Sequence, residues 1–189
     1  MNKLNVHGRL FVISGPSGVG KGTIAKELLK RNSGFKWSVS CTTRTPRPGE
    51  VNGKDYFFIS REDFDAKVKN GEFLEWAQVH GNLYGTLRSH LEGLLNKGDT
   101  VILEIDVQGA QNIKKSGFPC STIFLLPPSE ADLIKRLTGR GSESPETLKI
   151  RMDTAHRELQ ETDQYDHTVV NTIVKDTVTE IENIIKRTK

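Results

Sequence analysis

The sequence predicts an α/β fold in which a parallel sheet is covered by helices on both faces, and three observations support this. Short continuous apolar runs, typical of strands buried in a parallel sheet, recur along the chain. Segments with apolar residues at helical spacing alternate with these runs. A glycine-rich turn joins the first run to the first helical segment. Strands that alternate with helices in this way form parallel sheets.

The first strand is the apolar run over residues 10–13, which is bounded by glycines. The glycine-rich turn covers residues 15–22, and apolar residues at 24, 25, 28 and 29 then indicate a helix. The same criteria predict a helix over 87–96, strands over 101–106, 121–126 and 167–170, a helix capped by Ser129, a helix beginning at Pro145 and a C-terminal helix. Between Trp37 and Arg88 short strand-like pieces, glycines and polar residues predominate, and we interpret this segment as an inserted substrate subdomain.

Size and composition favour one soluble enzyme domain. The chain has 189 residues, of which 27% are charged and 35% hydrophobic, and a net charge of +3. This charge is too small for a nucleic-acid platform but suits a small anionic substrate. The cysteines Cys41 and Cys120 stand alone, without zinc-binding spacing, and the N-terminal region offers only a short apolar run. We therefore expect a cytoplasmic protein with no nucleic-acid or membrane partner.

A phosphate-binding loop is the strongest motif. Phosphates require converging N–H donors and no obstructing side chains, which glycines and a helix N-terminus provide. The motif is Gly15-Pro16-Ser17-Gly18-Val19-Gly20-Lys21-Gly22-Thr23. Lys21 can reach the β- and γ-phosphates of a nucleotide. The alternative, a glycine-rich turn with an incidental lysine, is disfavoured by the strand before the motif and the helix after it.

The loop alone indicates a nucleotide phosphate, as in GTPases, ATPases and small-molecule kinases, and it leaves open which groups hold the accompanying Mg²⁺. The motif normally places Ser or Thr directly after the lysine, but here Gly22 fills that position and Thr23 follows it. The metal is then held through water or by Thr23. Glu104 and Asp106 end a predicted strand, and their alternation places both on one face, near the loop. For Asp106 the alternative is a cap on the helix that begins near Val107.

The segment that follows the first α/β unit indicates a second phosphate site. Arg44 and Arg47 lie on a stiff, turn-rich segment, and two arginines can grip one phosphate bidentately. Their alternative is a solvent-facing pair. Tyr56 and Tyr84 downstream offer neutral hydroxyl donors. Glu75 follows in the alternating stretch Phe73-Leu74-Glu75-Trp76-Ala77, where a surface strand position is the alternative to a base-reading role.

These motifs together resemble the guanylate kinase family. The segment Thr42-Thr43-Arg44-Thr45-Pro46-Arg47, with Glu50, Gly53, Tyr56 and Phe58, is similar to the signature of that family. The phosphate-binding loop, Leu74-Glu75-Trp76, Tyr84-Gly85-Thr86, Ile105-Asp106-Val107-Gln108-Gly109 and the region of Arg140 follow in the family's order and extend the resemblance over essentially the whole chain. Departures are Gly22, where many members have Ser, and Thr86, where some have Ser.

The resemblance implies a three-layer P-loop nucleoside monophosphate kinase fold. Its parts would be a parallel core over about 1–36, 89–137 and 158–189, a GMP-binding insertion over about 37–88 and a short lid over about 138–157. It implies GMP-binding roles for Ser40, Arg44, Arg47, Tyr56, Glu75, Tyr84, Thr86 and Asp106. It implies ATP-binding roles for residues 15–23 with Arg136, Arg140 and Asn171. The residues expected to act on the transferring phosphate are Lys21, Arg44, Arg140 and Arg151.

The chemistry of guanine agrees with this assignment. Guanine presents an acceptor at O6 and donors at N1 and N2, so a carboxylate must accept and a hydroxyl must donate. Glu75 supplies the carboxylate, and either Ser40 or Thr86 supplies the hydroxyl. Adenine would mispair with such a site. The expected reaction is ATP + GMP giving ADP + GDP with Mg²⁺, and it requires no catalytic histidine because the GMP phosphate is already ionised.

Two other functions remain open at this stage. One is a guanylate-kinase-like binding module without catalysis, for which a degraded phosphate-binding loop and companion domains would be expected. The other is a kinase for a different nucleoside monophosphate, against which Glu75 and the hydroxyls argue. The sequence leaves the oligomeric state open.

Overall fold

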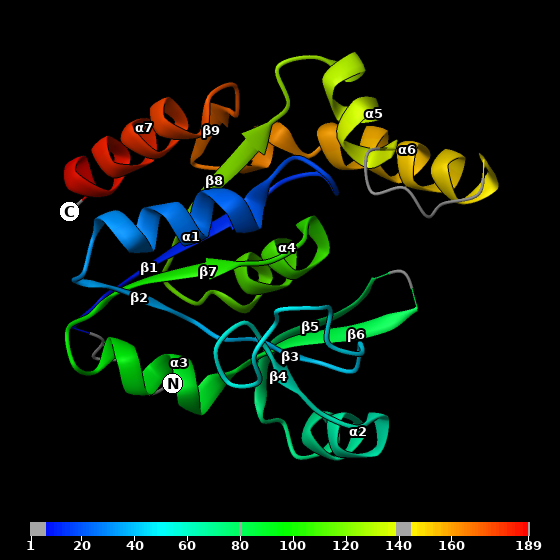
Figure 1. Ribbon diagram of the computed structural model, residues 1–189. Coiled ribbons are helices and arrows are strands. Elements are labelled where there is room, and N and C mark those ends of the chain that lie inside the picture. Colours follow the sequence, from blue (N-terminus) through cyan, green and yellow to red (C-terminus); the bar gives the residue numbers. More distant parts are fainter. Residues whose placement is uncertain (1–6, 80, 139–144, 189) are drawn as a thin grey trace. The chain divides into compact units, whose positions relative to one another are not determined.

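The computed structural model describes residues 7–79, 81–138 and 145–188 and divides the chain into two compact units. The first unit comprises residues 1–10, 34–103 and 108–120, and the second comprises residues 11–33, 104–107 and 121–189. Figure 1 shows the helices and strands of both units along the chain. Within the described ranges, no helix combines the length and the apolar character that a membrane span requires.

Parallel strands form the centre of the second unit. They are β1 (Arg9–Ser14), which begins in the first unit, β8 (Ser121–Leu126) and β9 (His167–Val170). β8 pairs in parallel with both β1 and β9. The apolar run Phe11-Val12-Ile13 is fully buried, as expected of a strand covered on both faces. The predicted α/β class with parallel core strands is therefore confirmed.

Helices of the second unit follow these strands. They are α1 (Lys21–Arg31), α5 (Glu130–Thr138), α6 (Pro145–Leu159), the 3-10 turn Thr162–Gln164 and α7 (Val174–Arg187). α1 and α7 lie side by side in Figure 1, and Asn32 donates from its amide to Glu182 across them at 2.8 Å. The predicted cap of α5 is confirmed, since the N–H of Asp132 donates to Ser129 Oγ at 3.1 Å.

The first unit contains a small sheet with the strand order β4-β3-β6-β5. The strands are β3 (Cys41–Thr42), β4 (Phe57–Phe58), β5 (Phe73–Val79) and β6 (Asn82–Leu87). β6 runs antiparallel to both β3 and β5, while β4 is parallel to β3. The side chains of Cys41, Phe64, Phe73 and Leu83 form a buried hydrophobic cluster against this sheet. This cluster stabilises the short strands.

Helix α2 (Arg61–Lys69) interrupts the segment that the sequence predicted as strand-like pieces alone. Ser60 caps the start of α2, because the N–H of Asp63 donates to Ser60 Oγ at 3.0 Å. Glu62 and Asp63 place negative charge in the first turn, which the helix dipole favours. The helix buries only Phe64, and this narrow apolar contact explains why hydrophobic spacing did not reveal it.

The first unit also contains β2 (Phe35–Trp37), which pairs in parallel with β7 (Thr100–Glu104). Its remaining helices are α3 (Arg88–Leu95) and most of α4 (Val107–Ser116). The prediction that the strand extends to Asp106 is wrong, because β7 ends at Glu104. The chain must leave the strand to begin α4 at Val107, which places Asp106 directly before that helix. A residue directly before a helix can cap it, and the sequence offered this role as the alternative for Asp106.

Candidate active site

The phosphate-binding loop connects β1 to α1 in a conformation that only glycine adopts without strain. Gly15 and Gly20 have φ values of 141° and 103°. A Cβ on Gly15 would lie 2.5 Å from the carbonyl oxygen of Leu125, and a Cβ on Gly20 would lie 2.7 Å from Nδ2 of Asn171. Both positions therefore exclude a side chain, and the main chain is left open to approach by a phosphate.

Lys21 begins α1 and turns back over the loop. Its Nζ donates to the carbonyl oxygen of Gly15 at 2.7 Å and to that of Pro16 at 3.2 Å. These contacts place an ammonium group at the N-terminal end of a helix, where the helix dipole also favours anions. The arrangement concentrates positive potential at the loop.

Arg136 and Asn171, both expected at the ATP site, hold the loop by its main chain. Arg136 Nη1 donates to the carbonyl oxygen of Val19 at 2.9 Å, and Asn171 Nδ2 donates to the same oxygen at 2.7 Å. Arg136 Nη2 also donates to the carbonyl oxygen of Asn171 at 3.1 Å. Thr177 orients the Asn171 side chain by donating to its Oδ1 at 3.2 Å. The structure thus gives Arg136 and Asn171 a positioning role that the sequence did not reveal.

Helix α6 presents one cation and one anion to Ser17. Arg151 Nη2 donates to Ser17 Oγ at 3.0 Å, and the N–H of Ser17 donates to Glu158 Oε2 at 3.2 Å. Arg151 is buried. Sequence reasoning predicted Arg151 but missed Glu158, whose only signal is its spacing of two helical turns from Arg151 on the same helix.

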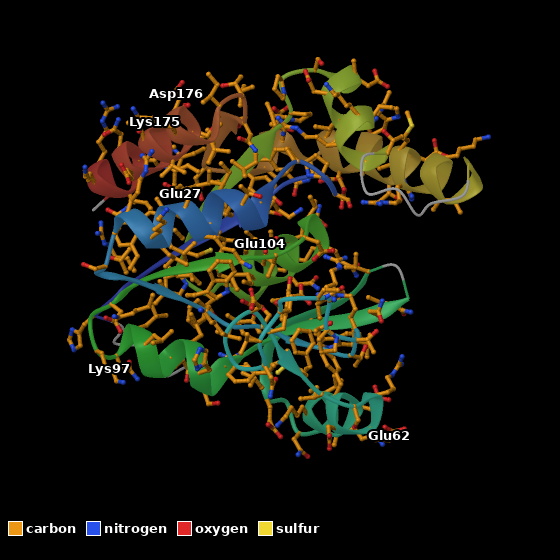
Figure 2. All side chains as sticks on the ribbon, viewed as in Figure 1. Glu27, Glu62, Lys97, Glu104, Lys175 and Asp176 are labelled. Carbon is orange, nitrogen blue, oxygen red and sulfur yellow. The ribbon has the colours of Figure 1, made fainter. Side chains whose placement is uncertain are left out.

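Glu104 and Asp106 contribute carboxylates near the loop. Figure 2 labels Glu104, which lies close to α1 in that view, and a Cβ on Gly22 would lie 3.7 Å from its Oε2. Removal from water raises the pKa of the Glu104 carboxyl, and the charge of Lys21 opposes this shift. In the ranges that the structure describes, no group of three or more His, Cys, Asp and Glu side chains is arranged to hold a metal ion.

In the first unit, Arg44 is the centre of a cluster with two tyrosines. Its Nη2 donates to both carboxylate oxygens of Glu50 at 2.9 Å, and its guanidinium lies 5.5 Å from the centre of the Tyr56 ring. The rings of Tyr56 and Tyr84 meet edge to face with centroids 6.0 Å apart. Burial lowers the pKa of Arg44, but the hydrogen bonds and charges of Glu50 and Tyr84 outweigh burial and raise it overall. Arg44 is therefore a permanent cation in a fixed orientation.

A row of polar side chains crosses the same sheet. Glu75 and Thr86 are register partners on β5 and β6, both buried, and Thr86 Oγ1 donates to Glu75 Oε1 at 2.6 Å. Ser40 directly precedes β3, and extending the antiparallel pairing of Cys41 with Gly85 by one residue sets Ser40 opposite Thr86. Within the described ranges the buried Ser40 Oγ has no hydrogen-bond partner. Three predicted GMP residues are thus brought together, and Glu75 faces inward while its neighbour Trp76 is 43% exposed.

Two predicted site residues are not placed in such networks. Arg47 is exposed, and its main chain contacts Glu50: the Arg47 N–H donates to Glu50 Oε2 at 2.7 Å, and the Arg47 carbonyl oxygen accepts from the Glu50 N–H at 3.0 Å. Arg140, with the adjacent Gly139 and Gly141, lies outside the described residues.

The family model for guanylate kinase matches residues 7–188 of the chain. The chain belongs to the guanylate kinase family. Guanylate kinases from Thermotoga maritima and Clostridium tetani are each 50% identical to it, over 95% and 96% of the chain and 86% and 87% of their own lengths. The crystal structure of guanylate kinase from Anaplasma phagocytophilum matches 95% of the chain and 85% of that protein with a TM-score of 0.76 and 36% identity.

Membership of the guanylate kinase family confirms the resemblance inferred from the signature between Thr42 and Phe58. It confirms the enzyme class as well, a phosphotransferase for ATP-dependent phosphorylation of GMP to GDP. Each substrate of guanylate kinases has a candidate half-site within a single unit: the phosphate-binding loop in the second unit and the polar sheet in the first.

Proposed function

We propose that this chain transfers the γ-phosphate of ATP to GMP, with the phosphate-binding loop holding ATP and the β3–β6–β5 sheet holding GMP. The buried hydrogen bond between Thr86 and Glu75, beside the unpartnered hydroxyl of Ser40, carries the proposal. Buried polar groups are costly unless they serve a partner, and guanine is a partner of the right chemistry.

The base is read by Glu75 and Ser40. The Glu75 carboxylate accepts from N1 and N2 of guanine, which both donate. Thr86 already donates its only hydroxyl proton to Glu75, so its role is to orient that carboxylate. Of the two hydroxyls that the sequence left open, this bond favours Ser40 as the donor for O6. Adenine would offer no O6 to Ser40 and a lone pair at N1 to Glu75.

The GMP phosphate is held by Arg44, Tyr56 and Tyr84. Glu50 accepts from Arg44 Nη2 and so fixes the plane of the Arg44 guanidinium. The other N–H groups of Arg44 therefore have a defined orientation. The two tyrosine hydroxyls add neutral donors without further charge. Arg47, exposed in this structure, would reach the same phosphate from the adjacent turn.

Transfer itself depends on position and charge. The attacking atom is a GMP phosphate oxygen that is ionised at neutral pH, so no general base is needed. Lys21 and the loop amides hold the donor phosphates, and Arg151 and Arg140 complete the compensation of the transferring charge. Arg136 and Asn171 keep the loop in shape through the Val19 carbonyl, which lowers the reorganisation that transfer requires.

Mg²⁺ is the proposed metal, because it neutralises charge on the phosphates that are transferred. Thr23, Glu104 and Asp106 offer oxygen atoms for this metal, and Mg²⁺ prefers such hard donors while keeping several waters. They fit a water-mediated site, since Gly22 supplies no hydroxyl and the space over it borders Glu104 Oε2.

The cytoplasm is the proposed compartment. Both cysteines are free thiols, as expected where disulfides are kept reduced. Burial raises the pKa of the Cys41 thiol to about 11, so this thiol is unreactive at neutral pH.

A coupled assay of ADP release with GMP, AMP, UMP and CMP tests the proposed reaction. We expect turnover with GMP and a rate lower by several orders of magnitude with the other three. Turnover that favours AMP or a pyrimidine would assign the chain to another monophosphate. Tight GMP binding in calorimetry without turnover would instead identify a binding module.

A further inference from the structure

The N–H of Ser17 is directed at a carboxylate of the protein itself. Glu158 Oε2 accepts this N–H at 3.2 Å across a sequence separation of 141 residues. Ser17 belongs to the loop whose main chain is shaped to hold phosphates. A carboxylate at this position therefore uses the same recognition that a phosphate oxygen uses, namely an N–H donor in a positive potential.

Packing of α6 fixes the carboxylate in place. Ala155, between Arg151 and Glu158 on the helix, is buried in a cluster with Leu133 and Leu137 of α5. Arg151 anchors the same face of α6 to Ser17 Oγ at 3.0 Å. Because both contacts end on Ser17, a shift of either residue would disturb the other. The Glu158 contact is thus part of a defined interface between α6 and the loop.

The charges around Glu158 are those of the ATP half-site. Burial raises the pKa of its carboxyl above the ordinary value of 4.5, while Lys21, the Ser17 N–H and Arg157 lower it and Asp106 raises it. The carboxylate therefore draws on the charge of Lys21, which a triphosphate would also require. An anion at this location competes with phosphate for both the N–H and the lysine.

We propose that Glu158 is an internal anion that occupies the phosphate-binding loop in the nucleotide-free protein and is displaced by the triphosphate of ATP. The inference rests on the proposed function, since it requires that the loop bind ATP. Its consequence is that Glu158 keeps the loop in a phosphate-ready shape and at the same time lowers the affinity for nucleotide.

Glu158→Gln tests this directly, because glutamine keeps an acceptor oxygen for the Ser17 N–H but carries no charge. We expect calorimetry to show Kd values for ATP, ADP and inorganic tripolyphosphate that fall roughly five- to tenfold, as expected from removing one nearby like charge. The Kd for GMP should not change. Tripolyphosphate reports on the loop alone, since it has no base.

The matched control is Asp153→Asn, which removes an exposed carboxylate from the same helix and should leave all four Kd values unchanged. Glu158→Ala is the second variant and should tighten nucleotide binding in the same direction, with thermal melting used to check that each variant is folded. Unchanged or weaker ATP binding in folded Glu158→Gln would overturn the inference and leave Glu158 as a structural acceptor. Failure of the wild-type protein to bind ATP would overturn the proposed function instead.

Discussion

The two proposed half-sites would recognise phosphate and base with different parts of the polypeptide. The ATP half, in the second unit, is built mainly from the main chain of a glycine-rich loop, and even its supporting side chains hold a main-chain oxygen, that of Val19. The GMP half, in the first unit, is built from side chains on neighbouring strands, with Glu75, Thr86 and Arg44 in fixed hydrogen bonds.

This difference follows from what each half must distinguish. Main-chain N–H donors recognise negative charge and are indifferent to the rest of the ligand, which suits a phosphate donor. Side-chain carboxylates and hydroxyls distinguish one base edge from another, which suits the choice of acceptor. Substitutions in the ATP half should therefore act on turnover or on nucleotide affinity, and substitutions in the GMP half should act on the choice and affinity of GMP.

The largest effect is expected from Lys21→Ala. Lys21 acts on a phosphate whose charge is redistributed in the transition state, so its loss should lower kcat by on the order of 10²-fold or more while the fold persists. Steady-state assays beside Lys30→Ala, an exposed lysine of the same helix, check this. Near-normal kcat in a folded Lys21→Ala protein would remove Lys21 from the transfer step.

Glu75→Gln should affect GMP alone. Glutamine still accepts from Thr86 but turns a donor toward the guanine edge, which costs roughly 2 kcal/mol, or about 30-fold in kcat/KM for GMP. The KM for ATP should change little. A variant that uses GMP as well as the wild-type protein would show that Glu75 does not read the base.

Arg44→Lys keeps the charge but loses the planar fork that Glu50 orients. We expect the Kd for GMP to rise about tenfold in calorimetric titration, because one bidentate contact becomes a single one. The Kd for ATP serves as the internal control. An unchanged GMP Kd would place Arg44 outside the site.

The smallest effect on GMP binding is expected from Ser40→Ala, which should leave the free energy of unfolding unchanged. Loss of one neutral hydrogen bond should weaken GMP binding about fivefold, whereas stability should not fall because the buried hydroxyl has no partner among the described residues. Thr86→Val is the matched contrast: it removes the 2.6 Å bond to Glu75 and should lower the free energy of unfolding by about 1–2 kcal/mol. Equal destabilisation by both changes would contradict the division of roles between the hydroxyls.

The sequence was informative wherever local pattern and local structure coincide. The apolar run Ser121–Leu126 is the strand β8 as predicted, and the cap at Ser129 is present. Three glycines of the phosphate-binding loop, Gly15, Gly18 and Gly20, stand where the backbone has positive φ. Strand alternation left a surface position open for Glu75, whereas the structure buries this side chain. Helix α2 was missed although Ser60, Glu62 and Asp63 carry an N-terminal signal, because the helix buries a single apolar residue.

The sequence by itself therefore determined the family and the α/β class, and it predicted the residue types of both proposed half-sites. What only the tertiary structure decided is which groups meet: Glu158 with Ser17, Arg136 and Asn171 on the Val19 carbonyl, and Thr86 rather than Ser40 on Glu75. Local spacing encodes backbone conformation because its causes lie within a few residues. Contacts across 117 to 152 residues depend on how whole helices and strands pack, and no local pattern records that.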